Sequence, residues 1–200
     1  MIRKVKSMAE KTAASHFLRF NLVLAGAIIM AVSQLSATAD RKLPPLETVS
    51  HVDLDRYMGK WYEIASFPQW FQKGCVATSA TYAFRKDGAV EVLNQCRKET
   101  LDGKPKDAKG KAWVVDPKTN AKLKVRFFWP FSGDYWIIDL GENYEYAVVG
   151  HPKRTYLWIL GRTPQMDPDV YDGILERLKK QHYDLTPLRK TLQPPQKSAQ

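Results

Sequence analysis

The chain has 200 residues and a formal net charge of +10, from 31 Lys and Arg against 21 Asp and Glu residues. This length suits one domain with its own core and a processed or flexible end. The positive surplus can favour anionic surfaces or solubility. The basic residues form no repeat with aromatic residues, so we expect no nucleic-acid partner.

Residues 1–39 are predicted to be an export signal. A basic region between residues 3 and 19 precedes an apolar run over 22–32, and Ala37-Thr38-Ala39 offers a small-residue cleavage site. The run is short for a membrane span, and an uncleaved anchor is the alternative. No cysteine lies just after the run, so we expect no lipid anchor. The mature protein is predicted to be periplasmic or associated with the outer membrane.

The two cysteines, Cys75 and Cys96, are predicted to form a disulfide, because an even count in an exported chain favours pairing. A hairpin that turns at 86–88 sets Cys96 opposite Thr78, and Cys75 lies three positions further along. Two free buried thiols are the alternative.

Eight strands are predicted, at intervals of about 10–14 residues and joined mostly by short turns. An extended lead-in at 40–52 and a polar turn precede them. The strands are expected at 59–67, 76–85, 89–98, 110–116, 121–129, 134–140, 144–151 and 155–162. Residues 101–109 are charged and contain Gly103 and Pro105, so we expect a mobile loop there. This spacing is typical of an all-β, up-and-down antiparallel barrel.

One helix is predicted after the eighth strand. Asp167 can cap it and Pro168 suits its first position. Val170, Ile174 and Leu178 recur at four-residue steps, which gives one apolar stripe for packing outside the barrel. Residues 185–192 are expected to add a short final strand, and residues 193–200 a disordered tail.

The motifs at the two ends of the barrel carry a family resemblance. Gly59-Lys60-Trp61-Tyr62-Glu63-Ile64 opens the first strand, and the run from Tyr156 to Pro164, with Gly161-Arg162, closes the eighth. With the intervening strands, residues 50–190 resemble the lipocalin family, in particular its bacterial outer-membrane branch of the Blc type, which is related to apolipoprotein D. The resemblance implies that Arg162 lies over Trp61 at the closed end of the barrel, next to Gly59. Residues 53–192 would then form the lipocalin barrel and its helix.

The resemblance also implies a ligand site inside the barrel. The positions carried over are Tyr57, Tyr82, Asn94, Phe127, Tyr135 and Trp158. Trp158 shares a strand face with Arg162, because residues two apart on a strand point to the same side. Apolar walls with few polar groups suit a hydrophobic ligand, and the bacterial branch favours a fatty acid or lysophospholipid. A barrel filled by its own side chains, serving as an interaction module, is an alternative.

Enzymatic motifs are missing from the sequence. It has no Gly-x-Ser-x-Gly elbow, no glycine-rich phosphate loop and no metal-ligand spacing among its four histidines. We therefore expect a binding protein without cofactor or metal, with a lipid-modifying enzyme as the alternative. Phe67, Trp70 and Phe71 lie on the first loop, where they form either a lid or an exposed patch that meets a membrane or a partner. A homodimer is left open.

Overall fold

The computed structural model describes residues 43–196. The predicted export signal at 1–39 lies outside these residues, as does the end of the tail at 197–200. Residues from Pro44 onward form one compact unit. Among the described residues, no helix is long and apolar enough to cross a membrane.

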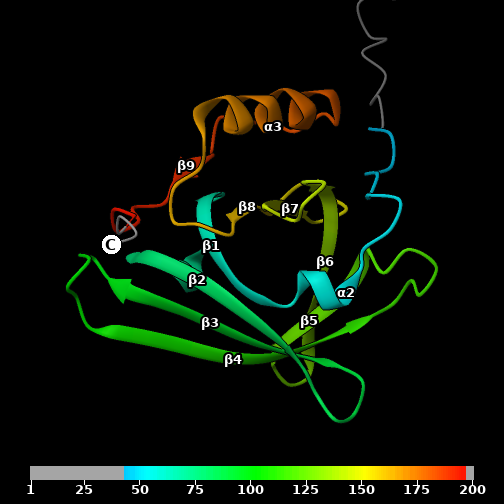
Figure 1. Cartoon of the computed structure of the whole chain (residues 1–200), viewed down its shortest axis with the longest axis horizontal. Helices are drawn as coiled ribbons and strands as arrows, with labels where there is room; N and C mark the ends of the chain where they lie inside the picture. Colours follow the sequence, from blue (N-terminus) through cyan, green and yellow to red (C-terminus); the bar gives the residue numbers. More distant parts are fainter. Residues whose placement is uncertain (1–42, 197–200) are drawn as a thin grey trace, which may run out of the picture. The chain divides into compact units, whose positions relative to one another are not determined.

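The unit is an eight-stranded antiparallel barrel with one helix outside it, as the sequence predicts (Figure 1). The strands run in chain order from β2 to β8, then to β1, and the pairing of β1 with β2 closes the barrel. The strands are β1 (Gly59–Ser66), β2 (Cys75–Phe84), β3 (Val90–Lys98), β4 (Pro105–Val114), β5 (Lys122–Phe128), β6 (Phe131–Leu140), β7 (Tyr146–Gly150), β8 (Leu157–Gly161) and the two-residue β9 (Arg189–Lys190).

Alternation along the strands separates two cores. On β8, Leu160 joins an inner cluster that includes Trp61, whereas Leu157 and Ile159 join an outer cluster beneath the helix. Successive strand residues point to opposite faces, so one strand serves both cores. The alternation of inner and outer residues therefore specifies both the lumen and the helix-binding face.

Helix α3 (Pro168–Lys180) covers the outer cluster. The Asp167 carboxylate accepts hydrogen bonds from the Asp169 and Val170 amides, which satisfies two of the free N–H groups at the helix start. Ile174 and Leu178 are buried as predicted. Tyr171 is also buried, and Val170 is only partly covered.

The predicted mobile loop over 101–109 is wrong for its second half. Pro105 to Lys109 belong to β4, which pairs with β3 from Arg97–Pro105 to Val90–Ala112. The pairing uses backbone groups, so it does not need apolar side chains, and the exposed charges of this stretch face water. The connection that remains is the short one between β3 and β4.

The short elements mark the two ends of the barrel. Helix α2 (Leu54–Tyr57) lies at the closed end, where β1 begins and β8 ends, together with the β2–β3, β4–β5 and β6–β7 turns. The 3-10 helix η1 (Trp70–Gln72) lies at the open end with the β3–β4, β5–β6 and β7–β8 connections. Strand β9 pairs with the end of β1 and lies within the predicted final strand at 185–192, of which only these two residues are strand.

Candidate ligand-binding site

Arg162 and Trp61 form the floor of the barrel. The Arg162 guanidinium carbon lies 3.7 Å from the centre of the Trp61 ring, which is fully buried. The guanidinium also donates to the carbonyls of Met58 (2.9 Å), Lys60 (3.2 Å) and Tyr144 (3.2 Å). These bonds tie the end of α2, the start of β1 and the β6–β7 turn to Arg162, which directly follows β8. The floor geometry implied by the sequence is therefore present.

Gly59 has to be glycine at this floor. Its φ is +92°, a conformation that side chains disfavour, and a Cβ atom would lie 3.4 Å from Arg162 Nη1. The glycine lets the chain turn from α2 into β1 directly under the guanidinium.

Three tyrosines form a hydrogen-bonded cluster just above the floor. The Tyr135 hydroxyl lies 2.8 Å from the Tyr57 hydroxyl and 2.9 Å from the Tyr82 hydroxyl. The Tyr57 ring also packs on Trp61, with ring centres 5.0 Å apart. Two hydrogen bonds among three hydroxyl groups use two of the three hydroxyl protons, so the third is not used within the cluster.

Burial keeps these phenols neutral. Loss of solvation raises the pKa of Tyr82 to about 12, and raises the pKa values of Tyr57 and Tyr135 well above the ordinary value. The neighbouring phenols Tyr57 and Tyr82 raise the pKa of Tyr135 further, whereas the hydrogen bonds with Tyr135 lower the pKa values of Tyr57 and Tyr82 and offset part of the effect of burial. The cluster therefore offers neutral hydroxyls and no anion.

The closed half of the barrel is tightly filled. The space enclosed between the three tyrosines and apolar side chains from α2, β3, β4 and β5 is about 10 Å³. This is about the least volume that one water molecule needs. A ligand of acyl-chain size must therefore occupy the open half or displace the phenols.

The other predicted site residues lie on the inner faces nearer the mouth. Asn94, Phe127 and Trp158 are each only partly buried, whereas Leu160, two residues below Trp158, is 5% exposed. Coverage of the inner face thus falls from the floor toward the mouth. The structure places the six predicted residues in two groups, the tyrosine cluster and these three.

Gly110 sets the position of Phe127, one of the three residues nearer the mouth. A Cβ atom at Gly110 would lie 2.8 Å from the Phe127 ring, so the bare backbone of β4 accepts the ring of β5. Ala108 and Ala112 share this inner face with Gly110. Because these residues have small side chains or none, the Phe127 ring can lie directly against the inner face of β4.

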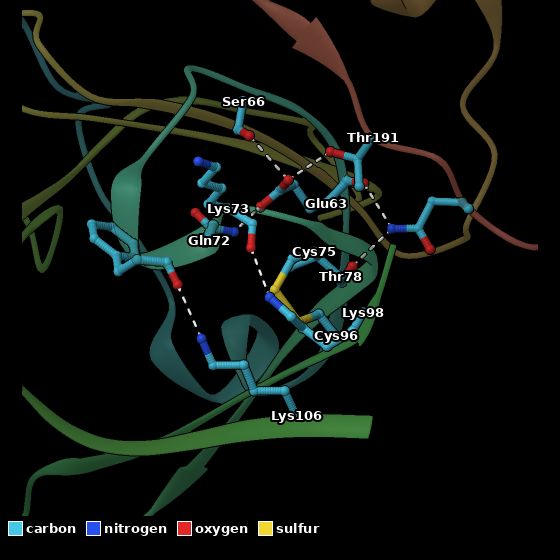
Figure 2. Close-up of a disulfide and its surroundings, with 12 residues drawn as sticks. Glu63, Ser66, Gln72, Lys73, Cys75, Thr78, Cys96, Lys98, Lys106 and Thr191 are labelled. Carbon is cyan, nitrogen blue, oxygen red and sulfur yellow. Dashed lines mark hydrogen bonds between the residues drawn. A yellow bond between two sulfur atoms is a disulfide. The ribbon is translucent and has the colours of Figure 1, made fainter. Parts of the chain in front are cut away.

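A buried polar network at the mouth was not identified from the sequence. The Glu63 carboxylate is 5% exposed and accepts from Ser66 Oγ at 3.0 Å, from Gln72 Nε2 at 2.8 Å and from Thr191 Oγ1 (Figure 2). The other amide atom of Gln72, Oε1, accepts from the Trp158 indole N–H at 3.0 Å. Gln72 therefore links η1 to the inner wall of the barrel.

The same network joins β1 to β2 where their direct pairing ends. The Gln193 amide donates to the carbonyls of Glu63 and Thr78, both at 2.8 Å. Gln193 lies in the stretch 193–200 that was predicted to be a disordered tail. Its side chain is only 9% exposed and connects the two strands. A glutamine followed by two prolines carries no local signal for such a contact.

The predicted disulfide is confirmed beside this network (Figure 2). Cys75 and Cys96 are bonded, with Cα atoms 5.5 Å apart. A bulge at Ala77, where φ is +49°, shifts the register of β2 against β3 between Val76 and Ser79. The bond fixes the C-terminal end of the η1 loop to β3.

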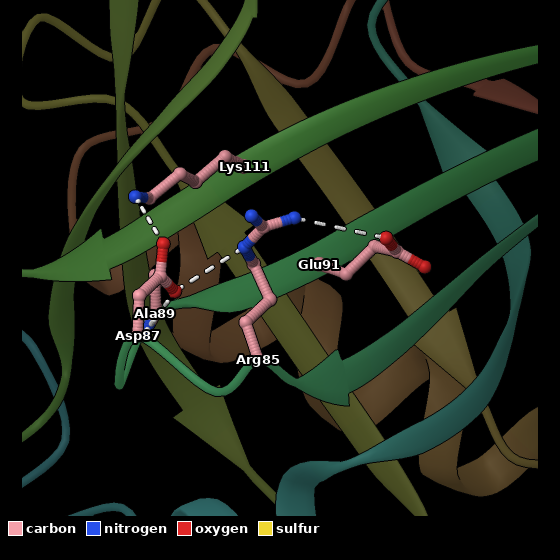
Figure 3. A network of polar contacts seen from close by, with 5 residues as sticks. All are labelled: Arg85, Asp87, Ala89, Glu91 and Lys111. Atoms are coloured by element: carbon pink, nitrogen blue, oxygen red, sulfur yellow. Dashed lines mark hydrogen bonds and ion pairs between the residues drawn. The ribbon is translucent and has the colours of Figure 1, made fainter.

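The outer surface has a larger hollow that does not suit an apolar ligand. It measures about 400 Å³ beside the β2–β3 turn. There Asp87 accepts from Lys111 and from Arg85, and Arg85 also lies near Glu91 (Figure 3). The bonds from Lys111 and the Ala89 amide lower the pKa of Asp87 to about 2. These exposed charges satisfy one another and stabilise the turn.

No metal centre is found in the described part of the chain, where no group of three or more His, Cys, Asp or Glu side chains could hold an ion. The lumen is built mainly from aromatic and aliphatic groups with a few hydroxyls. Such a lining suits binding of an apolar molecule through its open end.

Comparison with known proteins agrees with this architecture. A family model described as a lipocalin-like domain matches residues 52–193. Temperature-induced lipocalin-1 of Arabidopsis thaliana is 43% identical over 157 residues, covering 74% of this chain and 83% of the plant protein. Outer membrane lipoprotein Blc of Escherichia coli K12 is 39% identical over 145 residues, covering 72% and 81%. Apolipoprotein D of Bos taurus is 34% identical over 137 residues, covering 64% and 68%.

Solved structures share the fold at low identity. Insecticyanin from the tobacco hornworm Manduca sexta superposes with a TM-score of 0.59 at 19% identity, covering 74% of this chain and 85% of that one. Apocrustacyanin C2 gives a TM-score of 0.57 at 18% identity, covering 71% and 80%. At these identities the likeness concerns the fold alone.

Proposed function

Because the chain belongs to the lipocalin family, we propose that it binds one hydrophobic ligand, a fatty acid or lysophospholipid, in the open half of its barrel. The observation that carries the proposal is the incomplete burial of Asn94, Phe127 and Trp158 above a fully packed floor. Large inward-facing rings remain partly uncovered only where neighbouring side chains do not fill the space.

The chemistry of the lumen favours entry of the ligand tail first. Among the described residues, the buried polar and charged side chains are Glu63, Thr78, Ser79 and Gln193, and none of them is a cation. A buried carboxylate or phosphate without a positive partner costs several kcal/mol or more. The acyl tail would therefore contact Trp158 and Phe127, and the anionic head would stay at the mouth.

Relatives support the proposed cellular location as well as the proposed class of ligand. The bacterial relatives are named outer membrane lipoproteins, and we propose that this protein is exported and acts in the periplasm or at the outer membrane as a lipid carrier. The predicted signal at 1–39 supports export. No cysteine lies just after its apolar run, which supports a carrier without a lipid anchor.

Fluorescence titration of delipidated protein tests the proposal. A long-chain fatty acid or lysophospholipid should change the intrinsic fluorescence saturably, because the Trp158 indole would lose water on binding. Trp158→Phe should remove most of this change, while Trp113→Phe, a matched control on the outer face of β4, should keep it. No saturable response in the wild type would rule out these ligands and favour a barrel filled by its own side chains.

A further inference from the structure

The exposed aromatic side chains of this protein gather at one end of the barrel. Large aromatic rings at the open end are Trp70 (83% exposed), Phe71 (40%), Phe128 (75%), Trp129 (82%) and Phe131 (78%). At the closed end, the exposed aromatic ring among the described residues is Phe84, at 50%. Exposed rings of this size at one end mark a contact surface.

The rings project from two separate connections. Trp70 and Phe71 lie on η1, between β1 and β2, and pack edge to face with ring centres 5.7 Å apart. Phe128, Trp129 and Phe131 form the tip of the β5–β6 hairpin. The sequence indicated an aromatic cluster on the η1 loop but not at this hairpin tip. We call these five residues the aromatic rim.

The backbone beneath the rim is held in place. The Lys106 ammonium group donates to the Phe71 carbonyl at 3.3 Å, and Lys98 donates to the Lys73 carbonyl at 2.9 Å (Figure 2). The Cys75–Cys96 bond anchors the end of the same loop. Phe128 and Phe131 are paired across the hairpin. The exposed rings therefore project from backbone that is fixed by these contacts.

Positive charge surrounds the rim. The open-end segments 67–74, 97–109, 126–134 and 151–156 contain nine Lys and Arg residues against four Asp and Glu residues. A surplus of this sign is attracted to anionic lipid head groups, and Trp prefers the boundary between head groups and acyl chains.

We propose that the aromatic rim docks the protein, mouth first, on the surface of an anionic bilayer. The charge surplus selects the anionic surface, and the rings on η1 and on the β5–β6 tip enter the interface. A bilayer fits this rim better than a protein partner does. The rings stand on separate tips around the mouth, and a fluid interface can receive each tip without a matching shape.

Membrane docking does not require a ligand in the lumen, so the docking inference and the proposed ligand binding can be refuted separately. Protein stripped of lipid should still bind vesicles, and a failure of ligand titration leaves this inference untouched. If both hold, the mouth of the lumen opens toward the membrane from which a lipid would be taken.

Vesicle co-sedimentation tests the inference. The protein purified from its host envelope should bind phosphatidylcholine vesicles that contain phosphatidylglycerol, and should bind them more weakly at high salt or without the anionic lipid. Trp129→Ala combined with Phe131→Ala should lower binding ~10-fold or more, and Trp70→Ala should also lower it. Phe84→Ala, an exposed ring at the closed end, is the matched control and should bind like the wild type.

A second measurement locates the contact. Phospholipids brominated on the acyl chain should quench the tryptophan fluorescence of the wild type. Trp129→Phe should reduce this quenching, because it removes one of the two indoles of the rim. All of these residues are exposed, and thermal unfolding should confirm that each variant is folded. Absence of vesicle binding, as expected if the rim serves a protein partner, would overturn the inference. Vesicle binding that the rim variants leave unchanged, or that Phe84→Ala lowers equally, would overturn it too.

Discussion

At the scale of single residues, Arg162 joins parts of the chain that are distant in sequence. Its guanidinium covers Trp61 and bonds to carbonyls of residues 58, 60 and 144. A cation over a desolvated indole contributes more than the same contact in water. These contacts stabilise the floor of the barrel.

We expect Arg162→Ala to lower the free energy of unfolding by ~2–4 kcal/mol, because the contact with the buried Trp61 ring is lost and partly buried carbonyls lose their donor. Denaturant unfolding measures this change. Arg56→Ala is the control, because Arg56 also covers an aromatic ring, that of Tyr144, but is exposed; it should cost less than ~1 kcal/mol. If Arg162→Ala abolished lipid binding and left stability unchanged, Arg162 would be a ligand residue.

The tyrosine cluster predicts how stability depends on pH. The pKa of Tyr82 is raised to about 12 in the folded protein by burial, whereas an unfolded tyrosine ionises near ~10. Between these values the unfolded chain binds fewer protons than the folded one, so stability falls as pH rises. Below about pH 9 the cluster contributes no pH dependence.

Unfolding experiments across this alkaline range should show the fall, and Tyr82→Phe should make it shallower. Tyr62→Phe, on the neighbouring strand but outside the cluster, is the control and should leave the slope unchanged. A slope that Tyr82→Phe does not alter would show that its hydroxyl is not held neutral by burial.

At the scale of elements, η1 is connected to the lumen wall through Gln72. One amide side chain satisfies both Glu63, by donating, and Trp158, by accepting. Its loss leaves a buried carboxylate with one donor fewer and an indole N–H without its acceptor.

Gln72→Ala should therefore destabilise the protein by ~1–3 kcal/mol and shift the Trp158 emission, because the indole environment changes. Unfolding and emission spectra of the variant measure both effects. Gln95→Ala, on the exposed face of β3, should change neither. An emission spectrum of Gln72→Ala identical to the wild type would contradict the indole contact.

At the scale of the whole molecule, residues near the C-terminus complete the barrel. Direct pairing of β1 with β2 covers residues 59–62, and beyond it Gln193 bridges the two strands through the carbonyls of Glu63 and Thr78. Closure of the lumen thus depends on contacts that span more than a hundred residues.

We expect Gln193→Ala to lower the free energy of unfolding by ~1–3 kcal/mol, because two buried carbonyls lose their donor. It should also increase hydrogen exchange of the amides in the mouth-side halves of β1 and β2, which a purely local loss would not do. Gln165→Ala removes an exposed bond to the Pro194 carbonyl and should have little effect. Unchanged exchange along β1 and β2 in Gln193→Ala would show that the strands close without the bridge.

The sequence by itself determined the barrel and the helix, and its resemblance to the lipocalin family indicated the floor. Strand alternation, the turn at Asp87-Gly88 and the cap at Asp167 act over a few residues, so they can be recognised without knowing the fold. The site residues on β2, β3, β5, β6 and β8 were carried over from the family resemblance and lie on inner faces, and their role in ligand binding remains a prediction.

Tertiary structure alone decided the rest. The charged first half of β4 is a strand because β3 supplies its hydrogen-bond partners, which side-chain composition does not report. Glu63, Gln72 and Gln193 meet only because the barrel closes, and the packing of Phe127 over Gly110 depends on which strands become neighbours. The exposure of Trp129 could not be predicted either, because the sequence of an aromatic run such as 127–131 is the same whether its rings are buried or exposed. Local patterns specify elements, whereas burial and distant contacts depend on how those elements pack.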